Sequence, residues 1–180
     1  MEALSKPELL ALLQAAKTHS RRNWLMILVA YSHGLRASEV TQLQRDAVKD
    51  GHLTVARLKG SLRTVQPLIS DPEPLLNEGK ALFDFVRNLR GNQRLFPITR
   101  QHFWRLMQRY SEAAKIPARK RHPHILKHTI ALQTIHSAGI ENVRQYLGHK
   151  SMSSTGAYLK VTDSEASTAI SHALKSSLAV

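Results

Sequence analysis

The 180-residue chain has no cysteine, few acidic residues and no long apolar run. Without cysteine, disulfides, thiolate metal sites and cysteine nucleophiles are excluded. A membrane-spanning helix needs roughly 20 apolar residues, and the most apolar run, residues 24–31, is far shorter. The first ten residues lack the apolar segment of a signal peptide. These absences predict a soluble, cytoplasmic protein with no membrane partner.

The scarcity of acidic residues leaves a strong positive charge. Lysine and arginine number 26 against 13 aspartate and glutamate, which gives a net charge of +13. A protein this basic attracts polyanions, of which nucleic acid is the commonest. Ribosomal proteins, membrane-surface proteins and DNA enzymes share this composition, so the charge favours nucleic acid without identifying the activity.

The order of sequence patterns predicts one mainly α-helical domain with a small antiparallel three-stranded β-sheet in the N-terminal third. Ser5 and Glu8 form a capping-box pattern that begins a helix reaching about Lys17. Alternating apolar and polar residues at 52–58 and 63–68 predict the sheet. Further helices are expected at about 21–32, 39–43, 74–90, 99–115, 123–138, 141–147 and 163–178.

Two basic residues stand at positions where backbone geometry matters. Arg36 follows Gly34 at a helix start, where outward-pointing N–H groups favour a phosphate. Taken in isolation, Arg36 is more simply interpreted as a surface arginine paired with Glu39. Lys59 lies in the turn between the two best strands, where a lysine can reach a DNA groove and donate a proton. Taken alone, it also reads as an ordinary solvated turn lysine.

The second half of the chain contributes histidines, lysines and a tyrosine. His124 and Lys127 are three residues apart and share a helix face. Together with Arg119, Lys120 and Arg121 they predict a cationic patch, whose simplest role is nonspecific DNA-backbone binding; zinc binding is poorly supported, because no acidic partners accompany the histidines. Residues 147–149 read LGH, and Tyr158 follows nine residues later. A tyrosine hydroxyl needs nearby cations to become a nucleophile.

Taken in order, these segments resemble the catalytic domain of the tyrosine recombinases, the phage-integrase family, including Xer-type enzymes and the short fimbrial-inversion recombinases. The family pattern is G-L-R-x-S-E, a hairpin lysine, H-x-L-R-H, L-G-H and a tyrosine. Here it is found at residues 34–39, Lys59, residues 124–128, residues 147–149 and Tyr158. The resemblance extends over about residues 4–160, and it implies DNA contacts by Arg63, Arg119, Lys120, Arg121 and Lys150.

The resemblance implies DNA strand breakage and rejoining without a metal or other cofactor. Tyr158 would attack a backbone phosphate, leaving a 3′-phosphotyrosyl link and a free 5′-hydroxyl. Arg36 would hold the nonbridging oxygens, and Lys59 would protonate the departing 5′-oxygen. His124 would assist proton transfer at the nucleophile, and His149 would hydrogen-bond the phosphate.

One catalytic position departs from the family pattern. Lys127 stands where the family has its second arginine. Lysine keeps the charge but lacks the planar fork that grips two oxygens at once. Losing that contact in a transition state costs about 2–4 kcal/mol. A slowed enzyme and an inactive one both fit, and Arg119 or Arg121 are the candidates for compensation.

The resemblance also carries expectations about domains and assembly. Residues 1–180 are expected to form a single catalytic domain without the N-terminal core-binding domain of most family members. The segment 163–180 has an apolar stripe that predicts a helix. In the family such a helix often docks on a neighbouring protomer; folding back on its own domain fits equally well.

Three functions remain in view from the sequence. The leading hypothesis is a bacterial, archaeal or phage recombinase that acts on double-stranded DNA as a tetramer, through a Holliday junction, with accessory DNA-bending proteins as partners. The second is a DNA-binding protein of the same fold that lost catalysis through Lys127. The third is a generic basic helical protein whose motif matches are accidental, which five matches in order argue against.

Overall fold

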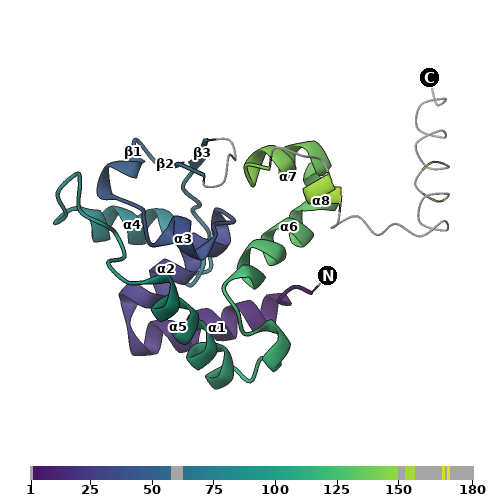
Figure 1. Ribbon diagram of the computed structural model, residues 1–180, viewed down its shortest axis with the longest axis horizontal. Coiled ribbons are helices and arrows are strands. Elements are labelled where there is room, and N and C mark those ends of the chain that lie inside the picture. Colours follow the sequence, from purple (N-terminus) through teal and green to yellow (C-terminus); the bar gives the residue numbers. More distant parts are fainter. Residues whose placement is uncertain (1, 58–62, 150–152, 157–167, 169, 171–180) are drawn as a thin grey trace.

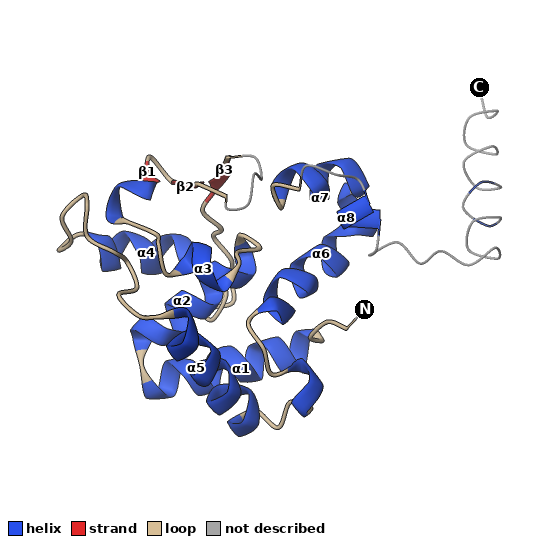
Figure 2. Cartoon of the chain, in the orientation of Figure 1, coloured by secondary structure: helices blue, strands red, loops and turns tan. Residues whose placement is uncertain are grey.

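The computed structural model describes residues 2–57, 63–149, 153–156, 168 and 170. Figures 1 and 2 show a mainly helical chain with a small sheet. The elements are α1 (Lys6–His19), α2 (Arg21–Ser32), α3 (Ala37–Val40), η1 (Arg45–Ala47), β1 (Val48–Lys49), β2 (His52–Val55), β3 (Thr64–Pro67), α4 (Glu78–Val86), α5 (Arg100–Ala113), η2 (Ala118–Lys120), α6 (His124–Ala138), α7 (Ile140–Tyr146) and α8 (Ser153–Gly156). The predicted fold class is confirmed.

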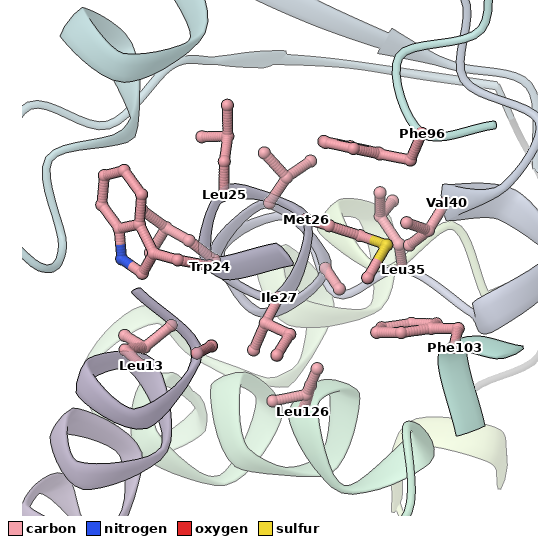
Figure 3. Packing of buried hydrophobic residues seen from close by; sticks show 14 of the residues in the cluster. Leu13, Trp24, Leu25, Met26, Ile27, Leu35, Val40, Phe96, Phe103 and Leu126 are labelled. Atoms are coloured by element: carbon pink, nitrogen blue, oxygen red, sulfur yellow. The ribbon is translucent and has the colours of Figure 1, made fainter. Parts of the chain in front are cut away.

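Helix α2 is the centre of the hydrophobic core. Residues 24–30 are all buried, and α1, α4 and α6 pack around them. Figure 3 shows Ile27 pointing toward Leu126 of α6, with Met26 near Phe103 of α5. The predicted capping box is present at the start of α1, where Ser5 accepts from the Glu8 amide and Glu8 accepts from the Ser5 amide.

The three strands form an antiparallel sheet in the order β1-β2-β3. His52 pairs with Pro67 and Val55 with Thr64 across the β2–β3 hairpin. Successive side chains of a strand point to opposite faces, so Leu53 and Val55 are buried together. The same alternation carries on past the end of β2 and turns Arg57 inward.

Two helix predictions need comment. The helix expected over residues 74–90 is wrong in its bounds, since α4 runs only from Glu78 to Val86. Residues 74–76 form a turn, and Asn77 caps the helix by accepting from the Lys80 amide. Of the helix expected at 163–178, Thr168 and Ile170 are helical, and the rest lies outside the described residues.

Helices α6 and α7 join the core through a close approach at Gly34. Gly34 has φ +56°, and a Cβ placed there would lie 2.3 Å from Cδ2 of Leu147. Leu147 is buried and follows α7, so the turn after α2 and the end of α7 meet where only glycine fits. Among the described residues, every helix is too short or too polar to cross a lipid bilayer.

Replacing Gly34 with alanine should therefore lower the free energy of unfolding by more than backbone strain alone would. The matched control is Gly51→Ala, because Gly51 has φ +72° but open space around it. We expect the control to lose about 1 kcal/mol of unfolding free energy. Gly34→Ala should lose that plus about 1–3 kcal/mol from overpacking against Leu147. Urea unfolding measures both, and equal losses would contradict the close contact.

Candidate active site

Arg36 stands at the start of α3, as its position after Gly34 predicts. Its backbone amide donates to Oε2 of Glu39 at 2.8 Å, and its Nη1 donates to Oε1 at 2.9 Å. The side chain of Arg36 is 27% exposed, whereas that of Glu39 is fully buried. The pair with Glu39 thus exists, and it holds a side chain of Arg36 that remains partly exposed.

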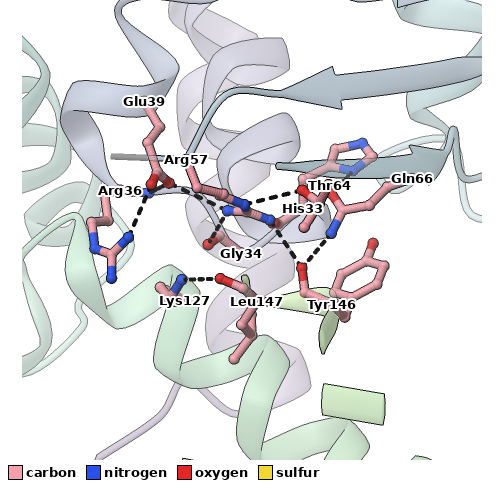
Figure 4. A network of polar contacts seen from close by, with 10 residues as sticks. All are labelled: His33, Gly34, Arg36, Glu39, Arg57, Thr64, Gln66, Lys127, Tyr146 and Leu147. Atoms are coloured by element: carbon pink, nitrogen blue, oxygen red, sulfur yellow. Dashed lines mark hydrogen bonds and ion pairs between the residues drawn. The ribbon is translucent and has the colours of Figure 1, made fainter. Parts of the chain in front are cut away.

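Glu39 is a buried carboxylate between two arginines, Arg36 and Arg57 (Figure 4). Burial by itself would raise the pKa of this carboxyl. The Arg36 amide and the positive charges around it outweigh burial and hold the pKa of Glu39 below its ordinary value. The carboxylate therefore stays charged and compensates part of the positive charge of the site.

Arg57 is a buried residue of this site that motif analysis of the sequence missed. Its side chain is fully buried and contacts Glu39 at 3.3 Å. It also donates to the backbone oxygens of His33 at 2.9 Å and Tyr146 at 3.0 Å. Extending the strand alternation from Leu53 and Val55 would have pointed to it. The arginine at the other end of the hairpin, Arg63, is exposed.

Lys127, in the place of the family's second arginine, is almost entirely buried. Its Nζ donates to the backbone oxygen of Leu147 at 3.0 Å. Burial, and then the positive charges of Arg57 and Arg36, lower its pKa to about 7, with Glu39 opposing the shift. Its ammonium group is thus held against the end of α7, as Figure 4 shows.

His149 lies just beyond α7 and is fixed on both sides. Its Nδ1 is 3.0 Å from Oγ1 of the buried Thr155, three residues before Tyr158 in the sequence. Its backbone oxygen accepts from Nη1 of Arg144 at 2.8 Å. Burial, and then the charges of Lys127 and Arg36, lower the pKa of His149 to about 4. The imidazole is therefore neutral near pH 7.

His124 begins α6 and is exposed, with its ring edge-on to that of His128. Partial desolvation, and then the charges of Lys127 and Arg36, lower its pKa. A surface hollow of about 490 Å³ opens beside it. The lining residues are Arg36, Ala37, Ser38, Arg100, Gln101, Trp104, His122, Pro123 and His124.

The basic run before α6 is paired with glutamates. Arg119 forms an ion pair with Glu2, and Lys120 with Glu8 at 2.8 Å. Arg121 contacts Glu112 at 3.0 Å and donates to the Ile116 oxygen. These pairs reduce the positive charge that the sequence pattern suggests. Arg119 and Arg121 bind these glutamates rather than the groups around Lys127.

A second buried chain of polar contacts supports the same region. Nε2 of His33 lies 2.8 Å from Oε1 of Glu78, and both side chains are fully buried. Nδ1 of His33 lies 2.8 Å from Oε1 of Gln66, whose amide nitrogen donates to the Tyr146 oxygen at 2.6 Å. Helix α4, strand β3 and the end of α7 are thereby linked.

The structure thus brings Arg36, Lys127 and His149 around one buried network, with His124 electrostatically coupled to it at the surface. Lys59, Lys150 and Tyr158 lie outside the described residues. Across the described ranges, no three histidine or acidic side chains gather closely enough to hold a metal ion.

The lowered pKa of Lys127 makes stability depend on pH. Between pH 7 and about 10 the unfolded chain keeps the proton of Lys127 while the folded chain loses it. The unfolding free energy should therefore rise with pH in this window, by up to about 1.4 kcal/mol per pH unit. Urea unfolding of the wild type and Lys127→Met should show the extra slope in the wild type alone. Parallel curves would contradict the burial of a titrating lysine.

Known proteins share both the sequence pattern and the fold. The profile of the Phage integrase family matches residues 2–165. The chain is 31% identical over 174 residues to the tyrosine recombinase XerA of Pyrococcus furiosus, covering 89% of the chain and 58% of that protein. It is 30% identical over 156 residues to XerD of Bradyrhizobium diazoefficiens, covering 79% and 49%. The chain thus spans about half the length of these curated relatives.

Solved structures give the same fold. A crystal structure of XerA recombinase superposes with a TM-score of 0.72 at 23% identity, covering 96% of this chain and 65% of that one. The catalytic domain of bacteriophage HP1 integrase gives a TM-score of 0.68 at 24% identity, covering 95% and 94%. With its matched profile and this fold, the chain belongs to the phage integrase family of tyrosine recombinases.

Proposed function

We propose that the chain is the catalytic part of a site-specific DNA recombinase that cleaves and rejoins strands through a 3′-phosphotyrosyl intermediate. The observation that carries this proposal is that α3, α6 and the end of α7 come together: Arg36 pairs with Glu39, Lys127 donates to the Leu147 oxygen two residues before His149, and the charges of Lys127 and Arg36 act on His149. Tyr158 follows His149 by nine residues in the sequence. Thr155 of α8 stands between the two in the sequence, and its hydroxyl contacts the His149 ring. Phosphoryl transfer to a tyrosine hydroxyl requires nearby cations, and Arg36 and Lys127 are the residues proposed to supply them.

The proposed roles follow from the geometry of each group. The side chain of Arg36 is partly exposed beside Glu39, so it serves to bind the nonbridging phosphate oxygens. His149 is neutral near pH 7, and its Nδ1 is proposed to accept from the Thr155 hydroxyl, which leaves the proton on Nε2 to donate to the phosphate. His124 assists proton transfer at Tyr158, and Lys59 protonates the leaving 5′-oxygen, both as the family pattern implies.

The proposed substrate is double-stranded DNA, with assembly on DNA as the working state. The net charge of +13 supports a polyanionic partner. Among proteins of similar fold, lambda integrase has been crystallised as a dimer on a core site and as a tetramer on a Holliday junction, and XerH with its difH substrate. Arg63, which is exposed, and Lys150 are proposed to contact the DNA backbone, as are the partly paired Arg119, Lys120 and Arg121. Accessory DNA-bending proteins are proposed as further partners.

An apolar hollow supports a role for the C-terminal segment in that assembly. It has a volume of about 270 Å³ and lies between α6 and α7, lined by residues such as Ile130, Val143 and Leu147. Ile170, in the predicted terminal helix, is 61% exposed. We propose that the segment 163–180 of one protomer docks in this hollow on its neighbour.

A second candidate function is DNA binding without catalysis. The observation that favours it is the burial of Lys127, whose ammonium donates to the Leu147 oxygen rather than facing the surface. A binding protein, however, has no need of the tyrosine or of the neutral His149.

Covalent trapping decides between the two candidates. The protein is incubated with supercoiled plasmid carrying the DNA that flanks its own gene, stopped with SDS and assayed for protein-linked DNA. We expect an adduct that Tyr158→Phe abolishes. Lys127→Arg should raise its rate by about 10–100-fold, because a guanidinium restores the two-oxygen grip.

Each outcome of the trapping assay has a defined meaning. Salt-sensitive DNA binding with no adduct from either Lys127 or Lys127→Arg protein would favour the binding function. An adduct that persists in Tyr158→Phe would contradict the assigned nucleophile. A Lys127→Arg rate equal to the wild type would show that the buried lysine suffices.

Docking of the C-terminal segment is tested by two independent changes. Deleting residues 163–180 removes the docking segment, and Thr134→Arg places a charge in the hollow, which Thr134 lines. Both should reduce higher-order protein–DNA complexes in native gels while single-protomer binding persists. Loss of assembly in the deletion with full assembly in Thr134→Arg would place the docking surface elsewhere.

A further inference from the structure

Arg57 uses every hydrogen-bond donor that an arginine has. A guanidinium carries five N–H donors. Nε donates to Oγ1 of Thr64 at 3.1 Å, and Nη1 donates to the Gly34 oxygen at 3.2 Å and to Oε2 of Glu39 at 3.3 Å. Nη2 donates to the backbone oxygens of His33 at 2.9 Å and Tyr146 at 3.0 Å. Each donor of this fully buried guanidinium thus has an acceptor, as Figure 4 shows.

The acceptors belong to the segments that carry the site. His33 and Gly34 come three and two residues before Arg36, and Glu39 holds the Arg36 side chain. Tyr146 ends α7, and His149 follows it by three residues. Arg57 itself comes two residues before Lys59 in the sequence. A single side chain therefore joins the segment that carries Arg36 to the end of α7, which leads to His149.

The end of α7 depends on this arrangement. The last carbonyls of a helix lack partners within it and form the negative end of its dipole. Here the Tyr146 oxygen accepts from Arg57 and from Gln66, and the Leu147 oxygen accepts from Lys127. These donors come from outside the helix, so they fix the position of the end of α7 and of His149, which follows it.

We propose that Arg57 is a positioning residue for DNA cleavage. Through the five hydrogen bonds of its guanidinium, it holds Arg36 and His149 at the positions that the phosphate requires. The proposal rests on the proposed recombinase function. Arg57 does not touch DNA in this arrangement, because its side chain is fully buried. Its charge also adds to those that shift the titration of Lys127 and His149, which gives the experiment a second readout.

Two substitutions of Arg57 distinguish the effect of its five hydrogen-bond donors from the effect of its positive charge. Arg57→Lys keeps the charge with three donors, whereas Arg57→Gln removes the charge. Lys49→Gln is the matched control, because it removes a charge from an exposed position on β1 of the same sheet. Single-turnover adduct formation at saturating protein, on the plasmid described above, reports cleavage rather than binding.

We expect both Arg57 variants to lower the single-turnover rate by about 100-fold, as small displacements of reacting groups do. Lys49→Gln should match the wild type, and all proteins should bind a nonspecific duplex equally. NMR titration should show a higher pKa for His149 in Arg57→Gln than the value of about 4 in the wild type. Arg57→Lys should leave that pKa low, because the charge remains.

Other outcomes overturn the proposal. A wild-type cleavage rate in Arg57→Lys would show that the charge alone matters. Loss of thermal stability and of duplex binding with an unchanged single-turnover rate would show a purely structural role. If neither variant folds, ¹⁵N spectra of the wild-type arginine side chains decide: separate, slowly exchanging Nη signals for Arg57 support the fork, and averaged signals refute it.

A DNA-independent readout separates this proposal from the proposed function. Inorganic phosphate, titrated while the ring signals of His149 are followed by NMR, probes the site without cleavage. We expect the wild type to bind phosphate about 10-fold more tightly than Arg57→Lys, since about 1.4 kcal/mol of positioning is enough for that difference. If the wild type forms no Tyr158-dependent adduct but this difference holds, the recombinase function fails and the positioning role of Arg57 stands. Equal phosphate affinities would overturn the positioning role.

Discussion

The buried contact between Glu39 and Arg57 is the interaction on which the candidate site depends. A charge taken out of water is tolerated when it is paired and its remaining hydrogen-bonding groups are satisfied. Glu39 achieves this through Arg57, Arg36 and the Arg36 amide, and Arg57 through oxygens on four other residues. The turn after α2, the hairpin and the end of α7 are joined by a polar interaction at the edge of the hydrophobic core.

The surroundings of this pair explain why nearby groups titrate abnormally. Lys127 and His149 share the low-dielectric region with two arginines and a single described carboxylate partner, Glu39. Burial and repulsion both favour their neutral forms. An anion bound in this region would add negative charge and so favour the protonated form of Lys127.

The sequence predicted the local features of the fold well, because these depend on neighbouring residues. Ser5 and Glu8 define the start of α1, and the alternation at 52–58 identifies β2. Arg36 was placed at its helix start because Gly34 marks it. The network around Arg57 was not predicted, because its acceptors are mostly backbone oxygens that leave no mark in residue types. The burial of Lys127 and the glutamate partners of Arg119 to Arg121 likewise depend on distant packing.

The hydrogen bonds of Tyr146 have a consequence for how the protein folds during synthesis. Its hydroxyl donates to the Ser32 oxygen, 114 residues away along the chain, and its own oxygen accepts from Arg57, 89 residues away. Contacts between such distant segments form late, because a long loop must close first. A nascent chain that has not yet emerged as far as α7 therefore lacks the acceptor oxygen of Tyr146 that joins the hairpin to the end of α7. An unfinished polypeptide of this kind would therefore hold its core helices before the segments around Arg57 are joined.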